Sequence, residues 1–337
     1  MRSYHINKGA GLEGLTLKEH DPPALGPHDV LVRVQAVSLN FREVMIMIHG
    51  AYPLPVKPDV IAVSDGAGEV IAVGEAVTRA RVGDRVAASI FPRWVDGPFA
   101  IEHAAQLGGS LDGMLTELVA LSEDALVPIP AHLSFEEAAT LPCAGVTAWN
   151  ALTGGKPLRA GEIVLTIGSG GVSLFALQLA KLSGARVIAT TSSDDKAARL
   201  ASLGADDVIN YRAAPDWPAE VSRLTGGRGV DHIVEVGGAE SLEKSFRSIA
   251  LGGEIAWVGT LGAGAPVVNL GGIFNAVASL RAVAVGSRAQ FVAMTRAIAA
   301  HRMRPVVDRV FSFDEAPAAF AYYAAGKAFG KVVIKVA

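Results

Sequence analysis

The chain has 337 residues, with 30 Lys and Arg against 33 Asp and Glu, and a formal net charge of −3 at pH 7. This length favours two domains, and the charge balance gives no basic footprint for nucleic acid. The apolar tract 249–280 contains Glu254, Asn269 and many glycines, which argues against a membrane helix. Cys143 is the single cysteine and the polar N-terminus has no signal-peptide core, so we expect a cytoplasmic protein without an intramolecular disulfide.

The two ends of the chain share one style of predicted structure. Mostly apolar segments in the first third predict strands at 30–37, 66–73 and 86–90. The tail returns to this pattern, with a predicted helix between two strands, at 305–311, 314–325 and 330–336. We therefore expect a β-rich domain built from residues 1–124 and 301–337, with a second domain at 125–300 inserted between them.

A glycine turn lies in the middle of the chain, between an apolar run and a helix-like segment. The run 163–167 is typical of a parallel strand that is buried on both faces. Gly168 and Gly170 permit a tight turn and a close approach of the backbone to a ligand. Gly171 and Val172 open a helix whose free N–H groups and dipole attract a phosphate. The pattern predicts a grip for the pyrophosphate of a dinucleotide.

The segments after this turn predict the rest of an α/β domain. Further strand-like runs lie at 186–191, 207–210, 231–236, 254–259 and 280–285. Helix-like segments lie between most of them, such as those at 194–203, 219–224 and 241–250. This alternation predicts a doubly wound parallel sheet. Because Ser173 replaces the third glycine of the usual pattern, a turn without a nucleotide is the alternative.

The end of the second strand of this domain bears on the choice of cofactor. NAD-binding folds place an acidic residue there, ~20 residues after the glycines. Thr191 takes that position here, so no carboxylate repels a 2′-phosphate. Ser192 and Ser193 can donate hydrogen bonds and Lys196 supplies a positive charge, which favours NADP(H) over NAD(H). The alternative is that Ser193 and Asp194 cap the next helix and that Lys196 is solvated.

Six further motifs lie in order at 38–43, 50–53, 64–74, 82–86, 138–148 and 329–334. Together with the glycine turn they resemble the medium-chain dehydrogenase/reductase superfamily over nearly the full length. Within it, the chain is most similar to the zinc-independent quinone oxidoreductase and alcohol dehydrogenase-like branch. The resemblance implies an α/β fold with a GroES-like β-rich catalytic domain and a doubly wound Rossmann domain that binds NADP(H). It also implies a dimer or tetramer.

The resemblance assigns further cofactor contacts. In the quinone oxidoreductase branch, a lysine and a tyrosine at the positions of Lys196 and Tyr211 contact the 2′-phosphate. A residue at the position of Thr147 contacts the cofactor. All three matches agree with an NADP(H) site.

The positions that hold catalytic zinc in zinc-dependent members of this superfamily are altered here. The first cysteine becomes Asn40, the histidine becomes Ser64, Asp65 stands in place of the following glutamate, and only Cys143 matches. Asn and Ser are poor zinc ligands. The stretch 91–113, which matches the structural zinc lobe, has no cysteine. We therefore expect no metal ion, and no other cation, to absorb negative charge in the reaction pocket.

A site without zinc favours particular chemistry. Hydride addition to a conjugated C=C or a quinone spreads the charge over an enolate or phenolate, which a few hydrogen-bond donors can stabilise. Tyr52 is the first candidate catalytic residue, because the tyrosine of this motif is the proposed proton donor in related enoyl reductases. Asn40 matches a position beside the nicotinamide and could orient cofactor or substrate. A cleft-lining aromatic residue and a structural loop asparagine are the respective alternatives, and His49 or Asp65 could instead serve as acid or base.

These observations predict a reductase of quinones, enones or related conjugated carbonyls. A zinc-free alcohol/aldehyde dehydrogenase and a non-catalytic NADPH-binding protein are the alternatives. The aromatic segment 91–99 lies where the family forms its substrate mouth, so we expect a small apolar carbonyl or quinone as substrate, although surface packing of a long loop would explain it equally. The strand at 280–285 ends the nucleotide sheet, and an exposed apolar edge favours a homodimer.

Overall fold

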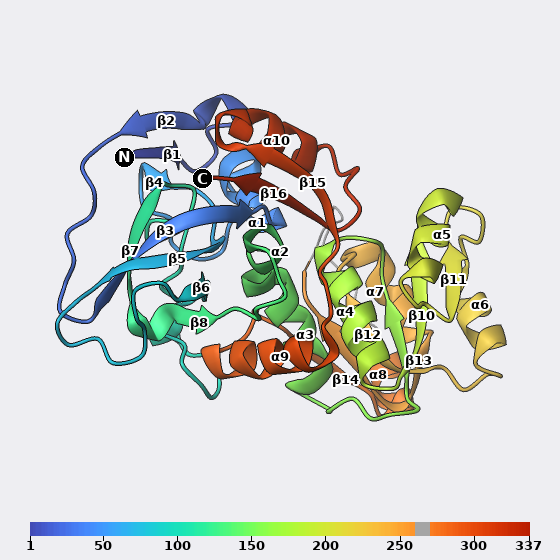
Figure 1. Ribbon diagram of the computed structural model, residues 1–337. Coiled ribbons are helices and arrows are strands. Elements are labelled where there is room, and N and C mark those ends of the chain that lie inside the picture. Colours follow the sequence, from blue (N-terminus) through green and yellow to red (C-terminus); the bar gives the residue numbers. More distant parts are fainter. Residues whose placement is uncertain (260–269) are drawn as a thin grey trace. The chain divides into compact units, whose positions relative to one another are not determined.

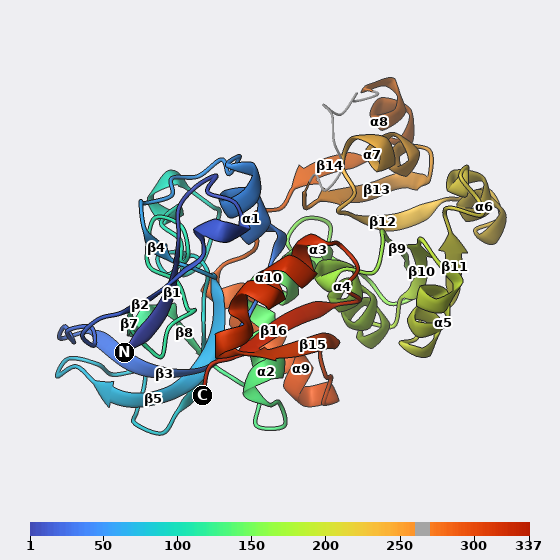
Figure 2. The same ribbon diagram turned by 90° about the horizontal axis from the view of Figure 1, so that it is seen from above.

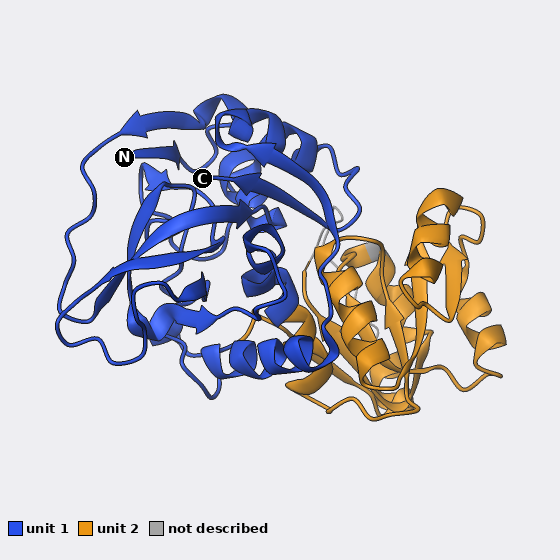
Figure 3. Ribbon diagram, in the orientation of Figure 1, with its two compact units in different colours: residues 1–146, 287–337 blue, residues 147–286 orange. Residues whose placement is uncertain are grey.

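A computed structural model describes residues 1–259 and 270–337. The segment 260–269, part of the apolar tract 249–280, lies outside the described residues. The chain forms two compact units: Met1–Val146 with Ser287–Ala337, and Thr147–Gly286 (Figure 3). They are called unit 1 and unit 2 below.

Unit 1 is built around a mainly antiparallel sheet with the strand order β15-β16-β3-β5-β6-β8, in which β7 also pairs with β3 (Figure 1). Its strands are β3 (Asp29–Ser38), β5 (Asp65–Val73), β6 (Arg85–Ala88), β7 (Leu118–Ser122), β8 (Leu126–Pro128), β15 (Val307–Ser312) and β16 (Lys331–Lys335). A smaller sheet contains β2 (Thr16–Glu19), β1 (Arg2–Ile6) and β4 (Val60–Ile61). Buried Val, Leu and Ile side chains of both sheets form one core.

The helical segments of unit 1 are short, apart from α9 (Arg288–His301) and α10 (Ala316–Ala324). The others are α1 (Phe41–Val44), α2 (Phe135–Ala138), two π-helical turns, η2 (Met45–His49) and η5 (Leu141–Gly145), and the 3₁₀ turns η1 (Leu12–Gly14), η3 (Ile101–His103), η4 (Glu123–Ala125) and η6 (Phe313–Glu315). Short π-helical turns often mark functional sites. Here η2 lies between Asn40 and Tyr52, and η5 contains Cys143.

Unit 2 is a parallel sheet with the strand order β11-β10-β9-β12-β13-β14. Its strands are β9 (Ile163–Thr166), β10 (Arg186–Thr191), β11 (Asp207–Asn210), β12 (Val230–Glu235), β13 (Ile249–Trp257) and β14 (Ser279–Ala282). Its helices are α3 (Val146–Thr153), α4 (Gly171–Leu182), α5 (Asp194–Ser202), α6 (Trp217–Leu224), α7 (Ala239–Phe246) and α8 (Leu270–Ala276). Figure 2 shows α6, α7 and α8 on one face of this sheet and α4 and α5 on the other. This is the strand order of a Rossmann fold, which confirms the expected fold class.

The compact units have different bounds from the expected domains. Residues 125–146 and 287–300 belong to unit 1. The reason is local pairing: β8 extends the large sheet through β6, and α9 contacts β8. Arg288, the first residue of α9, also donates its backbone N–H to Trp94 O at 2.9 Å.

One predicted element ends in the wrong place. The helix expected at 241–250 ends at Phe246, and β13 already begins at Ile249. Ile249 and Ala250 are buried, and Ile249 pairs with Val230 of β12. Sheet pairing therefore determines the structure of this apolar segment.

No helix among the described residues is long and apolar enough to cross a membrane.

Candidate active site

The glycine turn of unit 2 leaves open space above the backbone. Gly168 has φ +76°, a conformation that favours glycine, and its N–H is held by Thr190 Oγ1 at 3.1 Å. A Cβ built on Gly168 or Gly170 would meet no described atom within 4 Å. Gly170 is the N-cap of α4 and makes no side-chain cap bond, while Gly171 and Val172 are the first helical residues. The turn thus presents free N–H groups to open space, which fits a bound pyrophosphate.

Ser173 explains why the third glycine is dispensable. Its side chain is buried, and its Oγ donates to Ile167 O at 2.6 Å. The hydroxyl therefore packs back toward the preceding strand, and the turn retains its shape.

The candidate residues for the 2′-phosphate come from the carboxyl ends of β10 and β11. Thr191 pairs with Asn210 in the sheet, and Tyr211 N donates to Thr191 O at 2.9 Å, so Tyr211 lies beside the end of β10. Ser192 and Lys196 follow β10, and both are half-buried. Among the described residues, no carboxylate lies within ion-pair distance of the Lys196 ammonium. The structure therefore brings these residues together at one edge of the sheet.

Helix capping accounts for part of this segment. Ser193 is the N-cap of α5, and its Oγ accepts from Lys196 N at 3.4 Å. Asp194 accepts from Asn210 Nδ2 at 2.8 Å, which engages one of the two nearby acidic side chains. Thr191 Oγ1 is buried and has no hydrogen-bond partner among the described residues. Thr147 is buried at the start of α3 in the same unit.

In unit 1, Tyr52 belongs to a polar network around a buried arginine. Tyr52 is half-buried, and its hydroxyl donates to Gln106 Oε1 at 2.9 Å. The Arg42 side chain donates to Tyr52 Oη at 3.4 Å, to Glu43 Oε1 at 3.0 Å, to Gln106 Oε1 at 3.2 Å and to Gly108 O at 3.3 Å. Burial alone disfavours the charge of Arg42, but Tyr52 and Glu43 outweigh it and hold the pKa of Arg42 above its usual range. Arg42 is therefore a permanent buried cation beside the phenol.

Asn40 begins the same segment. It is the N-cap of α1, and its backbone N–H donates to Glu43 Oε2 at 2.7 Å. Its side-chain Nδ2 has two contacts at the limit of a hydrogen bond, 3.5 Å to Ser38 O and 3.5 Å to Ser64 Oγ. Its Oδ1 accepts from the ammonium of Lys331. Asn40 and Tyr52 are thus joined through Glu43 and Arg42.

The other altered positions lie in the same cluster. Ser64 Oγ donates to Asp65 Oδ1 at 3.0 Å and lies 3.2 Å from Glu43 Oε1. The backbone N–H of Cys143, in η5, donates to Asp65 Oδ2 at 3.0 Å. Val63, just before Ser64, has φ +68°, which is a strained conformation for a β-branched residue. Such strain is concentrated at functional sites.

Two acidic groups of the cluster have raised pKa values. Burial is the largest cause for Asp65, and with the nearby Glu43 it raises the pKa of Asp65 to about 6, against the opposing effect of Lys331. Burial also raises the pKa of the Cys143 thiol, and the carboxylates of Asp65 and Glu43 add to the effect. Without a metal ion, Cys143 is therefore a neutral thiol that is poorly suited to act as a nucleophile.

The cluster contains two cations that the sequence analysis did not identify. Arg42 and Lys331 are both buried in this network, with exposed fractions of 7% and 2%. Arg42, Glu43 and Lys331 lie inside the motifs 38–43 and 329–334, so the sequence contained a signal for them. Gln106 had none. His49, one of the alternative acids or bases, is exposed at the end of η2.

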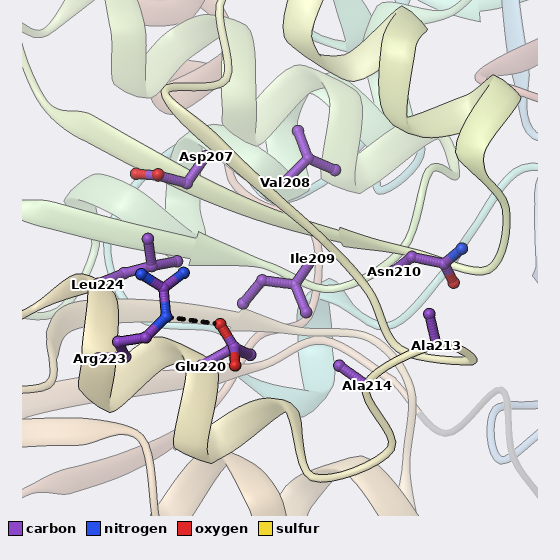
Figure 4. A pocket seen from close by; sticks show the side chains of 9 residues that line it. All are labelled: Asp207, Val208, Ile209, Asn210, Ala213, Ala214, Glu220, Arg223 and Leu224. Atoms are coloured by element: carbon purple, nitrogen blue, oxygen red, sulfur yellow. Dashed lines mark hydrogen bonds and ion pairs between the residues drawn. The ribbon is translucent and has the colours of Figure 1, made fainter.

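Two other features do not belong to this cluster. The rings of Phe91, Trp94 and Phe99 pack on one another, with centroids 4.9–6.3 Å apart, which agrees with packing within the loop. A surface pocket in unit 2 has a volume of 260 Å³. Residues of β11 and α6 line it, together with Ala213 and Ala214 (Figure 4). None of the candidate residues lines this pocket.

Comparison with known proteins assigns the family. Residues 26–131 match the model of the alcohol dehydrogenase GroES-like domain, and residues 171–300 match that of the zinc-binding dehydrogenases. A zinc-type alcohol dehydrogenase-like protein of Schizosaccharomyces pombe is 41% identical over 97% of this chain and 96% of its own length. A quinone oxidoreductase of Pseudomonas aeruginosa is 35% identical over 77% of this chain and 74% of its own length. The solved structure of an NAD-dependent alcohol dehydrogenase is 34% identical, covers 100% of both chains and has a TM-score of 0.91.

The chain belongs to the medium-chain dehydrogenase/reductase superfamily. It is an NAD(P)H-dependent oxidoreductase with a GroES-like domain and a Rossmann-type domain.

The residues of the cluster do not fit the zinc ion that the family model implies. Within 1–259 and 270–337, no group of three His, Cys, Asp or Glu side chains could hold a metal. Asn40 Oδ1 accepts from an ammonium, and Ser64 Oγ is bonded to Asp65, so of the altered positions only Cys143 offers a good zinc ligand. A zinc ion would have to break these contacts, and the amide and hydroxyl that it would gain are poor zinc ligands.

Proposed function

We propose that this protein is a zinc-independent NADP(H)-dependent reductase of quinones, enones or related conjugated carbonyls. The observation that carries the proposal is the Tyr52 phenol beside the buried Arg42 guanidinium, in a cluster whose donors do not suit zinc. Such a site can deliver a proton and stabilise a delocalised anion, but it lacks the Lewis acid that favours reduction of a simple carbonyl. The similarity to a quinone oxidoreductase supports the same substrate class.

Residues of unit 2 would hold the cofactor. Gly168, Gly170, Gly171 and Val172 would bind the pyrophosphate through backbone N–H groups at the start of α4. Ser192, Ser193, Lys196 and Tyr211 would surround the 2′-phosphate of the adenosine ribose, and Thr147 would also contact the cofactor. The preference for NADP(H) rests on Lys196 and on the absence of a carboxylate at Thr191. NAD(H) is the alternative, and one similar structure is that of an NAD-dependent enzyme.

Each catalytic residue has a role that its contacts allow. When bound, NADPH would supply a hydride for the β-carbon of the conjugated system. The Asn40 amide donates a hydrogen bond to the carbonyl oxygen, where negative charge develops as the enolate forms. The hydroxyl of Tyr52 turns from Gln106 and gives its proton to the α-carbon. Arg42 stabilises the phenolate left behind, which then takes a proton from solvent.

Alcohol/aldehyde interconversion without zinc is the second candidate. The S. pombe relative has an alcohol dehydrogenase-like name, and the pKa of Asp65 near 6 would suit a general base. However, Asp65 is fully buried, and both its oxygens accept hydrogen bonds. It is therefore a poor base for an incoming alcohol.

The proposal extends to assembly and location. The outer edge of β14 ends the sheet of unit 2, and α8 nearby exposes the apolar Leu270 and Phe274, at 74% and 81%. Pairing of two such edges in a homodimer would cover them. A cytoplasmic location rests on the single cysteine.

A steady-state assay tests the proposed activity. Purified protein is mixed with NADPH or NADH and with panels of quinones, enones and aldehydes, and the loss of nicotinamide absorbance is followed. We expect turnover of quinones or enones with NADPH and little turnover of aldehydes. Preferential turnover of aldehydes would contradict the proposal.

A further inference from the structure

Lys331 is a buried cation that no carboxylate neutralises directly. It is the first residue of β16 and is only 2% exposed. Among the described residues it has no Asp or Glu oxygen within 4.0 Å, and its ammonium donates to Leu39 O at 2.6 Å and to Asn40 Oδ1. Burying an ammonium costs several kcal/mol unless it is compensated. The two neutral acceptors compensate the charge only in part, and the Asp65 carboxylate, whose pKa Lys331 lowers, interacts with it from beyond ion-pair distance. The ammonium therefore polarises the groups that it contacts.

The contact with Lys331 fixes the orientation of the Asn40 amide. Because an ammonium has donors only, it must meet the amide oxygen and not the nitrogen. The Nδ2 group is therefore on the side of Ser38 and Ser64, with two contacts at 3.5 Å. Contacts of this length are weak, which leaves the N–H groups able to bond a better acceptor.

The same contact strengthens Asn40 as a donor. A positive charge at Oδ1 polarises the amide, and in a buried environment this makes the Nδ2 hydrogens more acidic. Asp65 and Glu43 are the carboxylates nearest to Ser64, and both already accept hydrogen bonds. Asp65 accepts from Ser64 Oγ and Cys143 N, and Glu43 accepts from the Arg42 side chain and from Asn40 N. The Asn40 amide also interacts with the Asp65 carboxylate, an interaction that lowers the pKa of Asp65, and it is the donor of the cluster that a cation reinforces.

We propose that Lys331 is a positioning residue that turns and polarises the Asn40 amide toward the oxygen that becomes negative in the reaction. This inference rests on the proposed function, because it assumes that an oxyanion forms on the substrate. In this account, an internal ammonium acting through an amide takes the electrostatic part that a metal ion has in zinc-dependent dehydrogenases. No proton leaves Lys331, and no bond to it forms or breaks.

The variants are chosen to separate this role from a structural one. Lys331→Met removes the charge with a similar length of side chain, and Lys331→Arg retains a cation. Lys335→Met is the matched control, because Lys335 lies on the same strand and is exposed. Thermal melting of each variant identifies any loss of folding, and Lys331→Arg keeps the test valid if Lys331→Met does not fold.

Kinetics give the first measurement. We expect Lys331→Met to lower kcat about 10- to 100-fold, since losing one oxyanion donor costs about 10²- to 10³-fold. Lys331→Arg should recover part of the rate, and Lys335→Met should keep it. Across a series of enones, the deficit of Lys331→Met should grow with the basicity of the enolate. A loss of kcat that is the same for every enone would overturn the proposal. A tenfold weaker NADPH affinity at unchanged kcat would also overturn it, because it would show that the lysine binds a nucleotide phosphate.

Binding of 4-nitrophenol in the presence of NADP⁺ gives a readout without turnover. Its absorbance distinguishes phenolate from phenol, so a site that stabilises an oxyanion lowers the pH at which the bound probe ionises. We expect Lys331→Met and Asn40→Ala to raise that pH by similar amounts, and the double variant to raise it no further. If the wild type shows this effect but reduces no enone or quinone, the proposed function fails while the role of Lys331 stands. An unchanged ionisation of the bound probe in Lys331→Met would contradict the role itself.

Discussion

The guanidinium of Arg42 lies over the ring of Tyr52, 5.0 Å from its centroid, and also donates to the phenol oxygen at 3.4 Å. The two residues are ten positions apart, and Arg42 is held by Glu43, Gln106 and Gly108 as well. The cation is therefore fixed where a phenolate would form. The nearby positive charge stabilises the phenolate that Tyr52 would leave on giving up its proton, so the pair suits acid catalysis better than a tyrosine alone.

A double-mutant cycle tests that relationship. We expect Tyr52→Phe to lower kcat by about 10²-fold, in the range of general acid catalysis, with little change in NADPH affinity. Arg42→Lys should lower kcat less, because a shorter, more mobile cation remains. In the Tyr52→Phe background, Arg42→Lys should have almost no further effect on kcat. If the two losses multiply instead, Arg42 does not act through Tyr52.

The raised pKa of Asp65 predicts a pH-dependent stability. The folded carboxyl titrates at about 6 and the unfolded one near 3.8, so the folded state binds the proton more tightly. The contribution of this group is fully present below about pH 4 and is lost as the pH rises to about 6, by roughly 3 kcal/mol. Asp65→Asn keeps a neutral side chain at every pH. We expect urea unfolding to show it about 1–3 kcal/mol more stable than wild type at pH 8, with the difference gone at pH 4.

A matched control accompanies that measurement. Glu102→Gln changes an exposed carboxylate of the same unit and should leave the stability difference independent of pH. A stability difference for Asp65→Asn that is the same at pH 4 and pH 8 would show that burial does not raise the pKa of Asp65.

The proposed preference for NADP(H) can be tested at Lys196. We expect Lys196→Met to weaken NADPH binding by about tenfold, because one charge-assisted contact to the 2′-phosphate is lost. NADH binding should change by less than twofold. Titration of protein fluorescence with each nucleotide measures both affinities, and Lys327→Met, an exposed lysine of unit 1, serves as the control. Equal weakening of NADPH and NADH would rule out a 2′-phosphate contact at Lys196.

Assembly can be tested through α8. Light scattering after gel filtration should give twice the chain mass of 34.9 kDa at micromolar concentration. The double variant Leu270→Glu, Phe274→Glu places charges on apolar side chains that a homodimer would cover, and should shift the protein toward monomer. Leu251→Glu is the control, because Leu251 is an apolar side chain of β13 that is equally exposed, at 76%. A wild-type protein with the mass of one chain would contradict the dimer.

The fold could be predicted further than the site. The alternation of strands and helices after Gly168 predicts the parallel sheet, because each element is determined by its local apolar period. Where a long-range contact determines the element, prediction fails. Ile249 and Ala250 continue a helical pattern, but pairing with β12 places them in β13.

The site depends on contacts between residues far apart in the sequence. The motifs identify Asn40 and Tyr52 singly, but the bond from Tyr52 to Gln106 spans 54 residues and that from Lys331 to Asn40 spans 291. No local pattern records such pairs. The buried charges of Arg42 and Lys331 also contradict the usual expectation that Arg and Lys are exposed. They become visible only when the large sheet brings β3, β5 and β16 together.

The central claim is that hydride goes to carbon of a conjugated system without a metal ion, and isotope transfer measures this directly. EDTA-treated protein, with its zinc content measured by mass spectrometry, is incubated with NADPH deuterated at C4 and an α,β-unsaturated ketone. We predict a saturated ketone that carries deuterium at the β-carbon, at an undiminished rate with far less than one zinc per chain. Deuterium at the carbinol carbon of an allylic alcohol, or a rate that EDTA abolishes and zinc restores, would contradict the account.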